Sequence, residues 1–66
     1  MDTKKRLARI MSALTQERLS TSELKGRAGL KGHIDPVLDL LLAAERRGKV
    51  RCHGKDERGE YLWSLP

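Results

Sequence analysis

Residues 33–50, HIDPVLDLLLAAERRGKV, decide the fold, because no other stretch of the chain marks a helix so clearly. Asp35 is expected to cap this helix, and Pro36 fits its first turn, where a missing N–H costs nothing. The helix should continue to about Arg47, with Gly48 providing the left-handed stop. Four apolar side chains at spacing i, i+3, i+4 and i+7 are predicted to face the core, namely Val37, Leu40, Leu41 and Ala44.

A second apolar row lies beside the core row and consists of Ile34, Leu38 and Leu42. Three interpretations stay open: cover by the first helix or a C-terminal strand, contact with a partner protein or a second copy, or contact with thymine methyl groups. A helix that reads the major groove normally presents Arg, Lys, Asn, Gln, Ser or Thr to the bases. This helix presents Asp35 and Asp39 instead.

Two shorter helices are predicted upstream. The first carries one apolar stripe, formed by Leu7, Ile10, Met11 and Leu14. Either Asp2 or Thr3 can cap it. Leu19 is expected to anchor a brief extended segment between the two helices.

A capping box marks the start of the second helix, because Ser20 is followed three residues later by Glu23. This helix should run to Arg27 or Ala28 and should end at Gly29, with Leu30 filling the turn that follows.

A β-hairpin is predicted after the third helix, because residues 50–53 alternate apolar and polar side chains. The return strand places three side chains on one face, which are Tyr61, Trp63 and Leu65. A charged loop, residues 55–58, joins the strands. The chain is therefore predicted to be one domain, residues 1–66, mainly α with a small β-hairpin. This is the winged helix-turn-helix fold, with three helices and a two- or three-stranded wing.

The charge of the chain favours a polyanionic partner. Fourteen Lys and Arg residues stand against nine Asp and Glu, which gives a formal net charge of +5 over 66 residues. Nucleic acid fits such a balance better than anionic lipid. Only two aromatic residues occur, Tyr61 and Trp63, which argues against a protein that stacks successive single-stranded bases. No apolar run approaches about 18 residues, so we expect no membrane insertion and a cytoplasmic location.

Neither a cofactor nor catalysis is expected. Cys52 is the single cysteine, which excludes an internal disulfide, and a buried hydrophobic role suits it better than a reactive one. No His or Cys spacing fits a metal site. His33 and His53 are isolated, and Ser20 and its neighbours are assigned to capping, so the chain is predicted not to be an enzyme.

Three segments resemble the small prokaryotic winged helix-turn-helix DNA-binding regulators: ERLSTSELKGRAGL (17–30), VLDLLLAAERRGKV (37–50) and GEYLWSLP (59–66). The resemblance covers nearly the whole chain. It implies binding of double-stranded DNA, with the third helix in the major groove and the wing over the backbone or minor groove. Iron-associated members of the family often carry several wing cysteines, whereas Cys52 is alone, so no iron–sulfur cofactor is implied.

The candidate DNA-binding residues surround the third helix and the wing; they are Lys25, Arg27, Lys31, His33, Arg46, Arg47, Lys49, Arg51, Lys55 and Arg58. Most would contact phosphates, which position a protein without reading sequence. Lys31, His33 and Arg58 are the candidates for base contact. The competing interpretation is a solvated basic surface, with Asp56 and Glu57 pairing locally with the two basic wing residues.

Two other hypotheses concern other surfaces. The first is a protein-interaction module, in which Ile34, Leu38 and Leu42 bind a partner protein or form a homodimer. The second is docking on an anionic membrane surface through the basic cluster of the first helix, Lys4, Lys5, Arg6 and Arg9.

Overall fold

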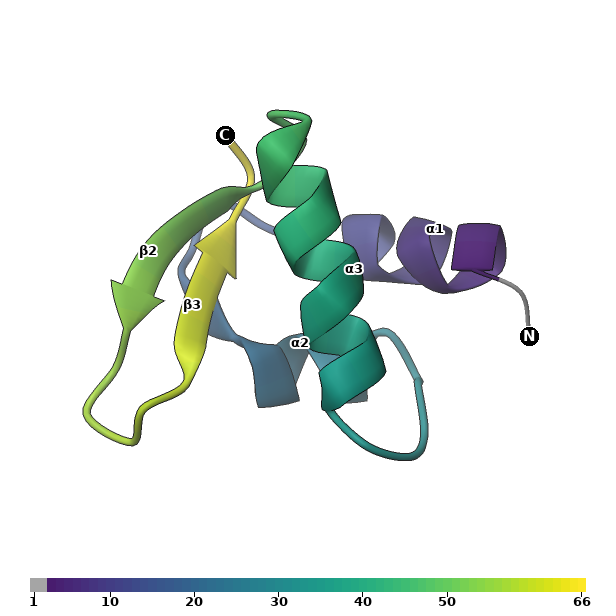
Figure 1. Cartoon of the computed structure of the whole chain (residues 1–66), viewed down its shortest axis with the longest axis horizontal. Helices are drawn as coiled ribbons and strands as arrows, with labels where there is room; N and C mark the ends of the chain where they lie inside the picture. The colour runs from purple at the N-terminus through teal and green to yellow at the C-terminus, as the bar shows by residue number, and fades with distance from the viewer. Residues whose placement is uncertain (1–2) are drawn as a thin grey trace.

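The computed structural model describes residues 3–66, which form three helices and three strands (Figure 1). In chain order these are α1 (Thr3–Ala13), β1 (Leu19–Ser20), α2 (Thr21–Arg27), α3 (Asp35–Arg46), β2 (Arg51–Lys55) and β3 (Tyr61–Ser64). Three helices followed by a hairpin that pairs with a short upstream strand make a winged helix, as the sequence predicts. The predicted cap at Asp2 lies outside the described residues.

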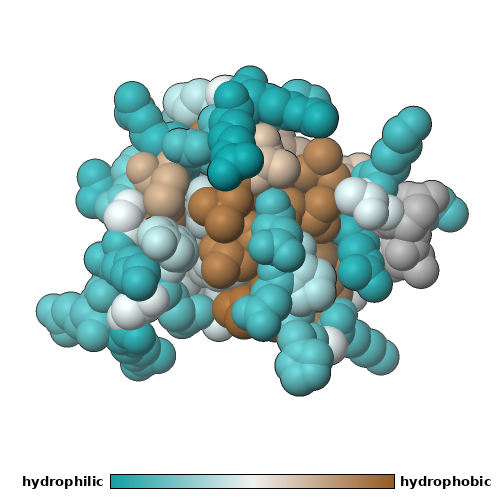
Figure 2. Space-filling model, viewed as in Figure 1, coloured by the Kyte–Doolittle hydropathy of each residue, from teal (hydrophilic) through white to brown (hydrophobic). Residues whose placement is uncertain are grey.

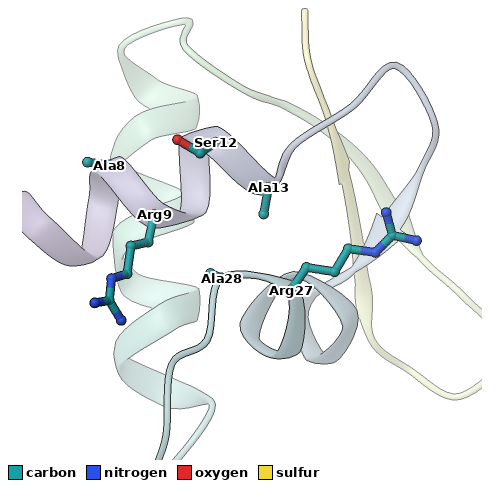
Figure 3. A pocket seen from close by; sticks show the side chains of 6 residues that line it. All are labelled: Ala8, Arg9, Ser12, Ala13, Arg27 and Ala28. Atoms are coloured by element: carbon teal, nitrogen blue, oxygen red, sulfur yellow. The ribbon is translucent and has the colours of Figure 1, made fainter.

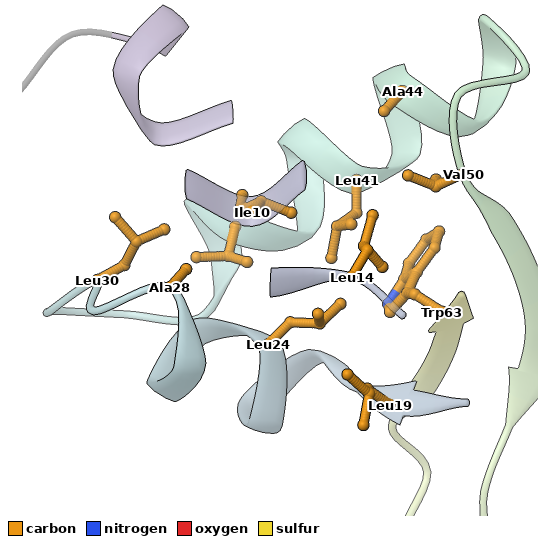
Figure 4. Packing of buried hydrophobic residues seen from close by; sticks show 11 residues of the cluster. Ile10, Leu14, Leu19, Leu24, Ala28, Leu30, Leu41, Ala44, Val50 and Trp63 are labelled. Atoms are coloured by element: carbon orange, nitrogen blue, oxygen red, sulfur yellow. The ribbon is translucent and has the colours of Figure 1, made fainter. Parts of the chain in front are cut away.

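A single hydrophobic core joins the helices to the sheet (Figure 4). Its largest fully buried side chains are Trp63, Ile10, Leu24 and Leu41, so every helix and the central strand contribute one. Burying an aliphatic side chain of this size stabilises the fold by about 1.5–3 kcal/mol. The three helices are thus held to the sheet by shared contacts around Trp63.

The two predicted apolar stripes face this core. On α3 the inward row is buried except for Leu40, which is half-buried against the core. On α1, Ile10 and Leu14 are buried, while Leu7 and Met11 are half-buried beside them. The 3.6-residue period of each stripe is therefore sufficient to orient both helices.

The ends of α2 and α3 follow the predicted glycine stops. Gly29 and Gly48 have φ of 69° and 72°, in the left-handed region where a side chain is strained. After α2, the N–H of Leu30 donates to the carbonyl of Lys25 at 3.1 Å, and after α3 the N–H of Lys49 donates to the carbonyl of Ala44 at 3.0 Å. Both ends are Schellman motifs, which fix the direction in which the chain leaves each helix.

The two helix starts differ from each other. Ser20 caps α2 as predicted, since its side chain accepts from the N–H of Glu23 at 3.2 Å. The predicted cap of α3 at Asp35 is wrong by one residue. Ile34 is the N-cap, because its carbonyl already accepts the first helical bond from Leu38 at 2.9 Å, and no side chain caps this end. Asp35 lies in the first turn, where its negative charge favours the helix dipole.

The sheet is antiparallel in the order β1-β3-β2, so β3 is the central strand and the wing is three-stranded. Trp63 pairs with Leu19 of β1 on one side and with Cys52 of β2 on the other. The segment at Leu19 that the sequence marks as extended is therefore an edge strand of the wing.

A buried hydrogen bond connects this central strand to α2. The indole Nε1–H of Trp63 donates to Thr21 Oγ1 at 2.8 Å, and that hydroxyl donates to the carbonyl of Tyr61 at 3.3 Å. Thr21 is itself buried at the first position of α2. One hydroxyl thus fixes the wing against the helix-turn-helix half of the chain.

The end of the hairpin differs in detail from the predicted loop 55–58. Lys55 belongs to β2 and pairs with Tyr61 across an irregularity that begins after Cys52. Gly54 lies in this irregularity with φ of 82°, which accounts for a glycine inside a strand. The turn is organised by Asp56, whose Oδ1 accepts from the N–H groups of Arg58 and Glu60 at 2.8 and 3.0 Å.

Replacing Thr21 with Val should lower the free energy of unfolding by about 1–3 kcal/mol, because the buried Trp63 N–H loses its acceptor while the side-chain shape is kept. Urea unfolding followed by Trp63 fluorescence measures this change. Ser12→Ala removes an exposed α1 hydroxyl and should change stability by no more than about 0.5 kcal/mol. Equal effects of the two substitutions would contradict the assigned role of Thr21.

Candidate nucleic-acid interface

Nine of the ten predicted DNA-binding residues fall into three groups in the structure, and Lys25 lies outside them. The first group, which we call the exit cluster, is Arg46, Arg47, Lys49 and Arg51. All four are exposed where α3 ends and β2 begins, and the Schellman motif at Gly48 fixes the backbone between them. Four positive charges lie within six residues, and two of them, Arg46 and Arg47, stand at the negative end of the α3 dipole, which favours positive charge there.

The second group, the wing-tip pair, consists of Lys55 and Arg58. Lys55 Nζ lies 5.2 Å from the centroid of the Tyr61 ring, a cation–π arrangement that directs the amine along the wing. The Asp56 carboxylate accepts two backbone N–H groups, and within residues 3–66 no ion pair connects it to either member of the pair. The competing interpretation, local pairing with Asp56 and Glu57, finds no ion pair among the described residues, and both cations face solvent.

The third group lies against α1. Arg27, Lys31 and His33 line a series of adjoining hollows that also include Arg6 and Arg9 of α1. Figure 3 shows Arg9 and Arg27 on either side of one of them, with small side chains between. We call this surface the α1 groove and define it by its five basic residues, which are Arg6, Arg9, Arg27, Lys31 and His33.

The sequence did not connect Arg6 and Arg9 with the α2–α3 turn. Their spacing of three residues, beside the inward stripe of α1, was the available signal that they share one helix face. Lys25, the remaining predicted member of this region, is half-buried on α2 and lines none of these hollows.

The exposed side of α3 carries little positive charge. Asp35, Asp39 and Ala43 are exposed along it, and Arg46 stands only at its C-terminal end. Figure 2 shows apolar surface in the middle of the face that carries α3, surrounded by hydrophilic side chains. A helix with this surface has few groups that can hydrogen-bond to base edges.

Part of the second apolar row of α3 is covered by the wing and part is exposed to solvent. Leu38 and Ile34 are half-buried and line a hollow shared with Tyr61 and Lys55 of the wing, so the wing partly covers them. Leu42 is 39% exposed, the one large hydrophobic side chain so exposed in the described chain. The interpretation of cover by a strand therefore holds for Ile34 and Leu38 and fails at Leu42.

The start of α2 is occupied by the wing itself. The Glu60 carboxylate accepts from the N–H of Ser22 at 3.2 Å and also from the Ser22 hydroxyl in a short hydrogen bond. Sequence reasoning missed this contact, because the two residues are 38 positions apart. The first turn of α2 already holds a carboxylate, which leaves the exit cluster, the wing-tip pair and the α1 groove as the cationic surfaces.

His53 is connected to the central strand. Its Nε2 lies 2.7 Å from Ser64 Oγ, and that hydroxyl donates to the carbonyl of Leu65 at 2.9 Å, so the imidazole must be the donor. Burial lowers the pKa of His53 below 6.5, and the positive charges of Arg18 and Arg51 lower it further. His53 is therefore a structural residue of the wing.

Metal binding and membrane crossing find no support in residues 3–66. These residues contain no group of three or more His, Cys, Asp or Glu side chains that could hold a metal ion. None of their helices has the length and apolar character to cross a bilayer; α3, the longest, has 12 residues. Comparison with models of known protein families and with curated protein sequences found no match.

An NMR titration of the His53 ring should give a pKa below 6.5, and Arg18→Gln should raise it because one repelling charge is removed. The unfolded chain then binds more protons than the folded one as the pH falls below about 6.5, so stability should decline between about pH 7 and pH 5. His53→Gln should show a smaller decline in urea unfolding. A ring pKa at or above 6.5 would exclude this origin of the pH dependence.

Proposed function

We propose that this protein binds duplex DNA, mainly through the phosphates, and regulates transcription from that position. The observation that carries the proposal is the placement of exposed cations at both ends of the exposed face of α3. The exit cluster lies at the C-terminal end of α3, and Lys55 lines the same hollow as Ile34 at its N-terminal end. The proposal includes no catalytic role and no cofactor, and it carries with it a cytoplasmic location.

The dimensions of α3 support this mode of binding. Its 12 residues span about 18 Å at 1.5 Å per residue. The major groove is about 12 Å wide, so a helix seated across it brings residues at both of its ends to the flanking phosphates. The exit cluster would contact one backbone and the wing-tip pair the other, while the apolar and acidic middle of α3 faces the groove.

Recognition of sequence is expected to be weak. The exposed middle of α3 offers Asp39, Leu42 and Ala43, of which Asp39 alone can hydrogen-bond a base, as an acceptor from cytosine. Phosphate contacts then supply most of the affinity, and they respond to salt rather than to sequence. We expect similar affinities for unrelated duplexes, and Arg58, which at the contacted backbone also borders the minor groove, is the main candidate source of preference.

Binding to a short duplex, measured by fluorescence anisotropy over a salt series, should weaken with a slope of log K against log salt of about −3.6, as expected for about four neutralised phosphates. The double variant Arg46→Gln/Arg47→Gln should reduce the slope to about −1.8, because two of these contacts are lost. Lys4→Gln removes an exposed lysine that lines none of the hollows and is the matched control. Its slope should equal that of the wild type. Absence of duplex binding at low salt would refute the proposal.

A second candidate function is contact with a protein, which the exposure of Leu42 favours. Leu42 lies one helical turn from Leu38, beside the hollow between α3 and the wing, in an apolar surface surrounded by charge. Such a surface is typical of protein contacts. Sedimentation velocity over a range of concentrations tests the homodimer form. Association that Leu42→Gln abolishes would favour it, whereas a strict monomer would remove its main support.

A further inference from the structure

The α1 groove is a continuous basic surface. Three hollows adjoin one another: the first and second share Arg9, and the second and third share Arg6 and Lys31. None of the residues that line the three hollows is acidic. Within residues 3–66 the guanidinium groups of Arg6, Arg9 and Arg27 form no ion pair with a carboxylate. The groove therefore concentrates positive charge that the fold itself does not neutralise.

Local structure fixes the positions of these cations. Arg6 and Arg9 are three residues apart on α1 and so project from one side of the helix. Leu30 is buried and its N–H is bound to the carbonyl of Lys25, which anchors the turn beside α1 and places Lys31 against the same groove. A cationic groove formed by anchored elements needs little reorganisation to accept an anionic chain.

Most of this groove lies on a different side of the molecule from the exposed face of α3. Figure 1 shows α1 extending to the right of α3, with only its C-terminal part passing behind α3, and Figure 3 shows α1 in front of α3. The molecule measures 17 Å along the axis of view in Figure 1. A straight duplex seated on α3 and the wing would not reach the hollow between Arg9 and Arg27.

We infer that the α1 groove is a second site for the phosphate backbone of duplex DNA, so that one chain holds two duplex segments at once. The inference rests on the proposed function and adds a second surface to it. In Figure 3 the side chains of Arg9 and Arg27 extend in opposite directions from the edges of this hollow, so a sugar–phosphate chain crossing it past the small residues Ala8 and Ser12 would meet a guanidinium group on each side. A membrane surface would instead require large apolar side chains that project beside the cations, and the hollow at α1 is lined by no apolar side chain larger than alanine.

A bridging assay tests this inference on the full chain. One duplex is fixed on beads, a labelled duplex of unrelated sequence is added, and its capture by the protein is measured at about 0.1 M salt, where one phosphate contact contributes roughly eightfold in affinity. Wild-type protein should capture the second duplex. Arg6→Gln/Arg9→Gln should reduce that capture by at least about tenfold while changing the affinity for a single duplex by less than about threefold.

Three further variants make the result interpretable. Arg27→Gln/Lys31→Gln changes the other wall of the groove and should also lose capture of the second duplex. Circular dichroism shows whether each variant is folded, so this variant still tests the inference if the α1 variant is unfolded. Lys4→Gln lies on α1 outside the groove and should capture as well as the wild type. The exit-cluster variant Arg46→Gln/Arg47→Gln should lose affinity for the immobilised duplex, which separates the two surfaces.

Three results would overturn the inference while leaving the proposed function intact. The first is binding of one duplex without capture of a second. The second is capture that the groove variants leave unchanged, which would assign bridging to association of the chain. The third is that the groove variants capture the second duplex as well as the wild type but no longer bind phosphatidylserine vesicles. That result would assign the groove to an anionic membrane. Failure to bind any duplex would instead refute the proposed function itself.

Discussion

The hydrogen bond from the Trp63 indole to Thr21 is the contact on which the position of the wing depends. Trp63 is fully buried in the central strand, and its N–H can find no water, so an acceptor inside the protein is required. Thr21 supplies that acceptor from the first turn of α2 and also binds the carbonyl of Tyr61. A 66-residue chain buries only a modest core, so apolar contacts alone define the position of the hairpin less sharply. The hydrogen bond from Trp63 to Thr21 fixes one arrangement of the hairpin against the helices.

The fixed wing determines which parts of α3 remain open. It partly covers Ile34 and Leu38, leaves Leu42 exposed, and occupies the start of α2 with Glu60. The cations consequently lie around α3 instead of along it, in the exit cluster and the wing-tip pair. On the proposed function this arrangement gives a protein that binds the backbone strongly and reads bases weakly, and the α1 groove adds a second surface of the same chemistry.

Features set by neighbouring residues could be predicted from the sequence, and features set by distant ones could not. The Ser20 cap, the stops at Gly29 and Gly48 and the inward stripes follow from local spacing, and all are confirmed. The N-cap of α3 is predicted one position too late, at Asp35 instead of Ile34, because both residues lie just before Pro36. The links from Thr21 to Trp63 and from Ser22 to Glu60 join residues 42 and 38 positions apart. The grouping of Arg6 and Arg9 with the α2–α3 turn likewise depends on how α1 packs, and that packing leaves no local pattern.

The most direct test of the account is an NMR titration of the backbone amides with duplex DNA at low salt. The account predicts chemical-shift changes at residues 46–51, at Lys55 and at Arg58, with the amides around the buried Trp63 unaffected. Saturation with duplex and no shift at those positions would contradict it. Shifts at Leu38 and Leu42 that follow protein concentration rather than DNA would assign this face to a protein partner instead.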